Sequence, residues 1–183
     1  MKNQHNRVTR KLTYNRYNCP DNFKRVLFHK GKTVVNILRQ RKDLLYNYLD
    51  NPKKIDEAFS TFTHGYYYKD IGDNIVGFCI WKNDYDVLKH SGKDYRTMYI
   101  ELLCFTPDDE KIHKMILFDL DSFAVIYKIN DIQIDIIKRK KDLVFYKEQG
   151  YEYIEESPLY FFMVKTIIYV QVPCDQLEFR DDL

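Results

Sequence analysis

The sequence predicts one mixed α/β domain, built from a β-sheet with helices on its faces. Two observations support this fold class: apolar residues alternate with a period of two in some segments and recur at helical spacing in others, and the two kinds of segment are interleaved. The 183 residues suffice for a single core, and 31% charged with 45% hydrophobic residues are globular values. We expect the domain to span residues 23–172, between a basic N-terminal arm (1–22) and an acidic C-terminal tail (173–183).

The chain is predicted to begin its fold with a strand and two helices. The segment "FKRVLFHKG" (23–31) reads as a strand that Gly31 ends. Apolar residues then recur near helical spacing from Thr33 to Leu49, which predicts an amphipathic helix. A shorter helix follows, because Asn51 is a good N-cap and Pro52 suits the first helical position.

A β-hairpin is the clearest local pattern in the sequence. Residues 64–71 and 74–82 both show strand character and are separated by Gly72 and Asp73, a pair that favours a tight turn. After a polar segment, "TMYIELLCF" (97–105) predicts a long buried strand. These strands are expected to form the centre of the sheet.

The second half alternates helices and strands. A long, half-buried helix is expected over residues 111–129, and a short helix over 140–150 ends at Gly150, where a left-handed conformation suits glycine. The remaining predicted strands are 132–137, 151–156 and 159–172. The order of elements therefore matches the fold class proposed above.

Cysteine and histidine usage gives no sign of a metal site. Four cysteines lie far apart without a C-x-x-C pair, and five histidines are scattered without zinc-ligand spacing. We expect free thiols and no metal. Cys79 and Cys104 fall in apolar strand patterns, where cysteine acts as a small hydrophobe.

The sequence also suggests a cytoplasmic protein without membrane contact. The N-terminal segment is basic and polar, unlike a secretory signal. The longest apolar stretch, residues 159–172, is interrupted by Lys165 and is too short to span a bilayer as a helix.

Charge is distributed unevenly along the chain. Residues 1–54 contain 14 Lys and Arg against 3 acids, whereas residues 55–183 contain 15 against 24. The basic third could bind nucleic acid or an acidic protein partner, or it could be a solvated surface that the acidic remainder neutralises. The candidate partner-binding residues, which are interleaved with tyrosines, are Arg7, Arg10, Lys11 and Arg16.

Three stretches in this order resemble the GNAT superfamily of N-acyltransferases. They are the hairpin "GYYYKDIGDNIVGFCIW" (65–81), the strand and turn "YIELLCFTPDD" (99–109) before the long helix, and "DLVFYKEQGYEYI" (142–154). The resemblance covers roughly residues 23–170 and implies a GNAT-like, mostly antiparallel central sheet flanked by helices. It also implies an enzyme that, if active, transfers an acetyl group from acetyl-CoA to an amine acceptor.

The resemblance also implies roles for individual residues. Tyr146 occupies the position of the acid that protonates the coenzyme A thiolate, although a tyrosine on a helix face can equally be a packing residue. Glu101 corresponds to the base that some relatives use on the acceptor amine, or it is an ordinary strand residue; period two places it on one face with Leu103 and Phe105. The backbone of Leu103, Cys104 and Phe105 would hydrogen-bond the pantetheine arm.

The loop before the long helix departs from the family pattern. Relatives have a glycine-rich loop there, which lets backbone N–H groups approach the pyrophosphate. Here "PDDEKIHKM" (107–115) has no glycine and contains three consecutive acids, which repel phosphate and also cap a helix well. Side chains that could supply compensating contacts to the cofactor are Lys111, His113 and Lys114.

Two functions follow from these observations. The first is a GNAT-fold protein that has lost normal acetyl-CoA binding and acts as a binding or assembly module without a cofactor. The alternative is an acetyl-CoA-dependent N-acetyltransferase with an atypical loop.

Overall fold

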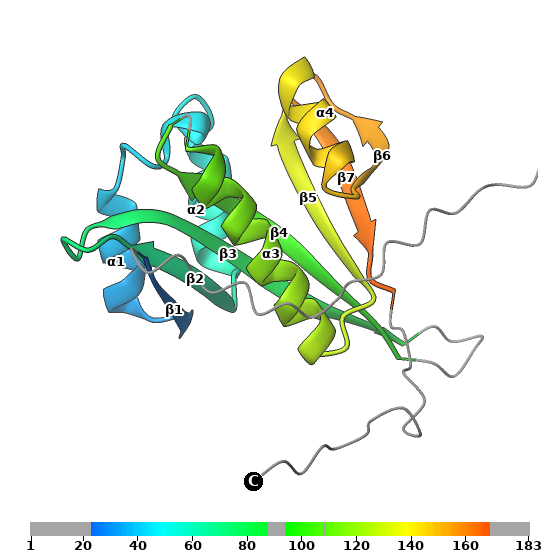
Figure 1. Cartoon of the computed structure of the whole chain (residues 1–183), viewed down its shortest axis with the longest axis horizontal. Coiled ribbons are helices and arrows are strands. Elements are labelled where there is room, and N and C mark those ends of the chain that lie inside the picture. The colour runs from blue at the N-terminus through cyan, green and yellow to red at the C-terminus, as the bar shows by residue number, and fades with distance from the viewer. Residues whose placement is uncertain (1–22, 88–93, 108, 169–183) are drawn as a thin grey trace, which may run out of the picture.

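The computed structural model describes residues 23–87, 94–107 and 109–168 (Figure 1). The predicted N-terminal arm and C-terminal tail lie outside these residues. The same is true of the four candidate partner-binding residues of the arm, and of Cys19 and Cys174.

The described residues form the mixed α/β fold that the sequence predicts, with the helices and strands in the predicted order. The strands are β1 (Lys24–His29), β2 (His64–Lys69), β3 (Ile75–Val87), β4 (Asp94–Phe105), β5 (Asp131–Ile137), β6 (Glu152–Glu156) and β7 (Tyr160–Thr166). The helices are α1 (Lys32–Gln40), the single 3-10 turn η1 (Tyr46–Tyr48), α2 (Pro52–Thr61), α3 (Glu110–Ile126) and α4 (Lys140–Glu148).

All seven strands form one sheet in the order β1-β2-β3-β4-β5-β7-β6. Every neighbouring pair is antiparallel except β4 and β5, which are parallel. One core packs the sheet against α3 and α4, and a second core packs the opposite face against α1, η1 and α2. The sheet is therefore covered on both faces, as Figure 1 shows.

The two halves of the sheet are joined along only part of β4 and β5. These strands pair from Thr97–Ile100 to Asp131–Ile134 and then separate, whereas β5 pairs with β7 along its whole length. Figure 1 shows the two strands diverging at this end. The separation leaves the last residues of β4 without a strand neighbour on the β5 side, and this is where the candidate site lies.

A β-bulge in β4 lies just where the separation begins. Ile80 is opposite Leu102 and Trp81 is opposite Ile100, so Glu101 is the extra residue. A bulge reverses which face the following side chains occupy. Ile100 accordingly packs in the core below α3, while Leu102 packs in the core below α1 and α2.

One predicted helix is wrong in its extent. The helix expected from Thr33 to Leu49 ends at Gln40, because Arg41 leaves the helical region (φ −82°, ψ 63°). The Arg41 side chain bonds to the carboxylate of Asp43 and to the carbonyl of Ile75, which fixes the turn. The helical spacing in the sequence comes from two separate segments, α1 and η1, which bury apolar residues in the same core.

Other local predictions are confirmed. The Asn51 side chain accepts a hydrogen bond from the Lys54 N–H at 3.2 Å, and Pro52 begins α2. Asp73 has a positive φ of 64° in the hairpin turn, and Gly150 has a φ of 89° after α4. In the described part of the chain, no helix is long and apolar enough to cross a membrane.

The two described cysteines are free thiols, as expected. Cys79 and Cys104 are both buried, and burial raises the pKa of each thiol. At neutral pH both are therefore protonated, unreactive core residues.

Candidate functional site

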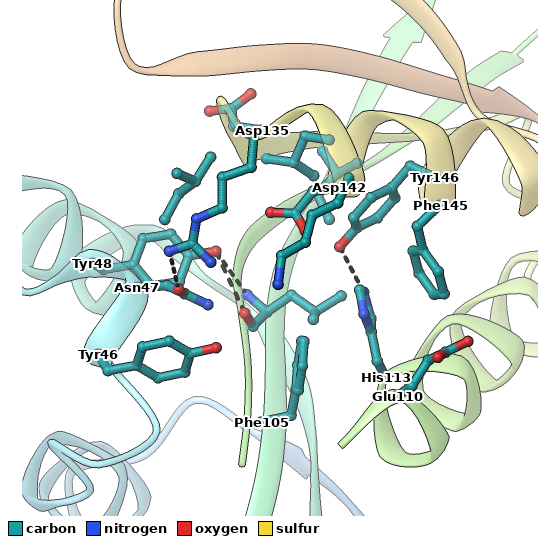
Figure 2. A pocket seen from close by; sticks show the side chains of 16 residues that line it. Tyr46, Asn47, Tyr48, Phe105, Glu110, His113, Asp135, Asp142, Phe145 and Tyr146 are labelled. Carbon is teal, nitrogen blue, oxygen red and sulfur yellow. Dashed lines mark hydrogen bonds between the residues drawn. The ribbon is translucent and has the colours of Figure 1, made fainter. Parts of the chain in front are cut away.

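A cleft of about 320 Å³ opens where β4 and β5 separate. Its walls come from η1, the end of β4, the first turn of α3, β5 and α4 (Figure 2). The volume lies at the small end of the range for ligand pockets. Of the residues assigned to the site from sequence, the cleft brings together Leu103, Phe105, His113 and Tyr146.

Tyr48 reaches from η1 to the exposed edge of β4. Its hydroxyl accepts a hydrogen bond from the Leu103 N–H at 3.4 Å and donates one to the Leu103 carbonyl at 3.5 Å. Tyr48 itself is only 6% exposed. One hydroxyl therefore bonds to both backbone groups of Leu103, the first of the three residues that, by family resemblance, would hold the pantetheine arm (Figure 2).

His113 fills the cleft between α3 and α4. Its ring stacks between Phe105 and Phe145, with centroid distances of 4.3 and 4.4 Å. Its Nε2 atom lies 2.9 Å from the hydroxyl of Tyr146, as Figure 2 shows. Burial lowers the pKa of His113 to about 3, so the ring is neutral at pH 7 and supplies no positive charge for an anion.

Tyr146 forms part of the cleft wall on α4. It is 4% exposed and packs edge-on against Tyr151 as well as bonding to His113. Burial raises the pKa of Tyr146 well above its ordinary value, because a phenolate would be poorly solvated there. The position is accessible from the cleft, yet the higher pKa makes the phenol a weaker acid.

The start of α3 has one side-chain cap. The Asp109 carboxylate caps the helix by accepting from the Ile112 N–H at 3.1 Å. Lys114 pairs with Glu110 at 2.5 Å, and the Lys111 ammonium lies 5.9 Å from the ring centroid of Phe23.

These contacts decide how well the residues present suit acetyl-CoA. Neither Lys111 nor Lys114 lines the cleft, and Cys104 packs in the opposite core. The acidic helix start lacks the glycines of the family's pyrophosphate loop and has one of its N–H groups capped by Asp109, and Tyr48 takes the Leu103 groups among those expected to hold pantetheine. The chain's own residues therefore do not fit the cofactor in this conformation.

Polar pairs connect the two sides of the gap between β4 and β5. They join η1 and α2 on one side to β5, α4 and β7 on the other. The pairs are Arg139 with Asn47 at 3.0 Å, Lys54 with Asp135 at 2.7 Å, and Asn51 with Tyr160 at 3.2 Å. They tie the segments on either side of Tyr48 to the β5 half of the sheet.

Glu101 lies on the other face of the sheet. It pairs with Lys82 at 2.9 Å and accepts from the Thr61 hydroxyl at 3.2 Å. The prediction that it shares a face with Leu103 and Phe105 is wrong, because the bulge at Glu101 breaks the alternation. It lines a second cleft of about 440 Å³.

The two clefts meet only at Ile134 and Asp135 of β5. The predicted acid Tyr146 and the predicted base Glu101 therefore lie on opposite sides of the gap. A substrate that used both residues would have to extend between the strands.

Sequence reasoning missed Tyr48, Asn47 and Arg139, which shape the cleft. Tyr48 and Asn47 lie in a segment that was predicted as continuous helix. The only sequence signal was the polar stretch "RQRKD" (39–43), which lacks apolar residues and coincides with the end of α1. Among the described residues, no group of three or more His, Cys, Asp and Glu side chains could hold a metal ion.

Comparisons with known proteins find similarity in structure only. No protein-family model matches the sequence, and no curated protein matches it significantly. Many solved structures share its fold.

Three of these structures illustrate the similarity. A GNAT family acetyltransferase from Elizabethkingia anophelis with acetyl-CoA bound has a TM-score of 0.57 at 15% identity, covering 80% of this chain and 99% of that chain. The ribosomal-protein-S18-alanine N-acetyltransferase from Escherichia coli has a TM-score of 0.59 at 9% identity, covering 80% and 96%. The PaiA N-acetyltransferase from Thermoplasma acidophilum in complex with coenzyme A has a TM-score of 0.55 at 12% identity, covering 78% and 99%.

These likenesses extend over nearly the whole of each solved chain. The mixed α/β arrangement of this chain, a mostly antiparallel seven-stranded sheet flanked by helices, matches the fold of these structures. The chain therefore has the GNAT acetyltransferase fold.

Proposed function

We propose that this protein is a GNAT-fold binding module that no longer uses acetyl-CoA in the usual way. The observation that carries the proposal is the double hydrogen bond between the Tyr48 hydroxyl and the Leu103 backbone. It occupies the strand edge at the point where the fold offers a cofactor its main-chain contacts.

Two contributions to the binding free energy of acetyl-CoA are unfavourable, which supports the proposal. Displacing Tyr48 would break two hydrogen bonds of 3.4 and 3.5 Å, which are long for a hydroxyl and so worth about 0.5 kcal/mol net each, before the cofactor gains any contact. An acid about 6 Å from a phosphate charge adds on the order of 2–3 kcal/mol of repulsion at an effective dielectric of about 20. Asp109 and Glu110 both lie at the helix start where a pyrophosphate would bind.

The direct test is titration of the full chain with acetyl-CoA. We expect neither heat of binding nor a rise in melting temperature at millimolar acetyl-CoA, because a ligand stabilises a fold only when it binds the native state. Desulfo-coenzyme A and ATP control for non-specific anion effects. Saturable binding of acetyl-CoA at micromolar concentration would disprove the proposal.

Amine acetylation with an atypical loop is the second candidate. It is favoured by one observation, the Tyr146 hydroxyl in the wall of a cleft between β4 and β5. Release of free thiol from acetyl-CoA in the presence of a panel of amines and basic peptides would establish it. That activity should then fall strongly in Tyr146→Phe and in Glu101→Gln if both residues take part.

We further propose that the module's partner is anionic, either a nucleic acid or an acidic protein, and that the basic first third of the chain contacts it. Support comes from the charge balance of residues 1–54. Binding should then weaken steeply as salt is raised. Neutralising Arg7, Arg10, Lys11 and Arg16 together should reduce both the affinity and its salt dependence, whereas salt-insensitive binding would contradict this assignment.

A further inference from the structure

Both edges of the sheet are open in the described part of the chain. β1 pairs only with β2, and β6 pairs only with β7. An open edge presents unpaired backbone N–H and C=O groups that can bind another strand. The two edge strands have six and five residues, so their lengths match.

The two edges carry opposite charges. β1 contains Lys24 and Arg25 and no acid, whereas β6 reads "EYIEE" and contains three glutamates and no base. All five residues of β6 are exposed. Lys24 and Glu155 have no ion-pair partner among the described residues.

Strand directions favour joining one edge to the other. Following the pairings across the sheet, β1 and β6 run in opposite directions. A second copy that continues the sheet, rotated by the twist that the sheet accumulates across its strands, would therefore set its β1 antiparallel to the first copy's β6. Antiparallel strands exchange perpendicular backbone hydrogen bonds across such a contact.

We propose that copies of this chain associate head to tail, with β1 of one copy adding to β6 of the next and continuing the sheet. Because two different surfaces meet, the contact is heterologous and builds rings or open chains of subunits. Pairing of like edges is opposed, since β6 beside β6 sets glutamates against each other and β1 beside β1 does the same with Lys and Arg.

The side chains allow a register in which both faces match. Arg25 and Leu27 share the α3 side of β1, because Arg25 bonds to Asp119 of α3. Tyr153 lies on the same side of β6, because it packs against Phe161 of that core. Placing Leu27 opposite Tyr153 brings together two exposed side chains, 43% and 41% exposed. Because β6 has a bulge at Ile154 that takes up one residue, the same register sets Arg25 opposite Glu156.

The opposite face completes the same register. Lys24 and Val26 alternate with Arg25 on β1, and Glu155 lies opposite Phe162 on the side of the second cleft. Val26 then faces Glu155. Lys24 lies diagonally across from Glu155, at a distance that the long Lys24 side chain can span. In this alignment the α3 side therefore matches Leu27 with Tyr153 and Arg25 with Glu156, and the other side brings Lys24 near Glu155.

Sedimentation velocity of the full chain tests the proposal from micromolar to millimolar concentration. The wild type should associate as concentration rises, and less so at high salt. Lys24→Glu or Glu155→Lys should each weaken association by roughly tenfold, because attraction becomes repulsion across the contact. An equimolar mixture of the two variants should restore it, since each then offers an edge complementary to the other.

Two further measurements keep the test decisive. Circular dichroism melting shows whether each variant is folded, and hydrogen exchange of the β6 amides in the wild type should slow as concentration rises. A wild type that stays monomeric, or association that survives both single charge reversals, would overturn the proposal. The proposal would also be overturned if the β6 amides exchanged rapidly only after deletion of residues 1–22. In that case the N-terminal arm, and not a second copy, would cover the β6 edge.

Discussion

The hydroxyl of Tyr48 holds both the N–H and the C=O of Leu103, at the edge of β4 that faces the gap in the sheet. The contact joins residues 55 positions apart and ties the 3-10 turn to the centre of the fold. The contact helps to stabilise the region where β4 and β5 separate. It also bears on function, because it decides whether the gap between these strands can accept a cofactor.

Tyr48→Phe should lower stability, because the backbone groups of Leu103 lose their partner inside a buried site. The expected loss is about 1–2 kcal/mol of unfolding free energy, the usual consequence of leaving buried polar groups unpaired. Urea denaturation measures it. Tyr153→Phe, at a 41% exposed tyrosine on β6, is the matched control and should change stability little. Equal effects of the two changes would show that the Tyr48 hydroxyl bonds contribute nothing.

Stability should also depend on pH through His113. Its pKa is about 3 in the folded chain, against 6.5 for an unperturbed histidine, so the unfolded chain binds more protons between these limits. The contribution of His113 is thus fully present above pH 6.5 and is lost as pH falls towards 3. One proton of difference corresponds to roughly 1.4 kcal/mol per pH unit.

The change His113→Phe keeps an aromatic ring between Phe105 and Phe145 but removes the titration. Its unfolding free energy, measured by denaturant titration at several pH values, should fall less steeply with acid than that of the wild type. Parallel curves for the wild type and His113→Phe would exclude the buried neutral histidine.

Local sequence signals predicted the parts of the fold that depend on neighbouring residues. Asn51 and Pro52 start α2 because a cap and a fixed φ act within one turn. Asp73 and Gly150 adopt positive φ where a turn and a helix end require it. These features were readable because their physical cause lies within a few residues.

The candidate site depended on contacts that the sequence does not show. The bulge at Glu101 arises from the register between β3 and β4, so simple alternation placed Glu101 on the wrong face. Tyr48 reaches Leu103 only because the chain turns at Arg41, where a side chain bonds to the distant Ile75 carbonyl. Long-range contacts therefore determine what the cleft can bind, although the strand and helices around it were predictable.

Arg25 and Asp119 form the polar connection between β1 and α3. The Asp119 side chain is 8% exposed and bonds to both Arg25 and the Tyr68 hydroxyl, the latter at 2.9 Å. Arg25→Ala would leave a buried carboxylate with one partner fewer. We expect a loss of about 1–2 kcal/mol, less than for a fully buried pair because the Arg25 side chain is 45% exposed.

The surface pair of Arg39 with Asp56 provides the matched comparison for Arg25. Both of its side chains are well exposed, at 42% and 67%, so Arg39→Ala should have a much smaller effect. Chemical denaturation of the two variants side by side measures the difference. If Arg39→Ala proved equally costly, the buried carboxylate would not be the cause.

Among the glycines that the structure describes, Gly65 is the one where a methyl group should be least tolerated. A Cβ there would lie 2.7 Å from the Cys79 carbonyl of β3 and 2.4 Å from the ring of Phe28, so both a side chain and the backbone of the neighbouring strand would have to shift. Overpacking of this kind costs roughly 1–3 kcal/mol. Gly31→Ala is the control, because the nearest atom to its added methyl group is 3.9 Å away. Thermal unfolding should therefore show a clearly lower melting temperature for Gly65→Ala and little change for Gly31→Ala. Equal melting temperatures for the two variants would mean that the strands around Gly65 can move apart without cost to the core.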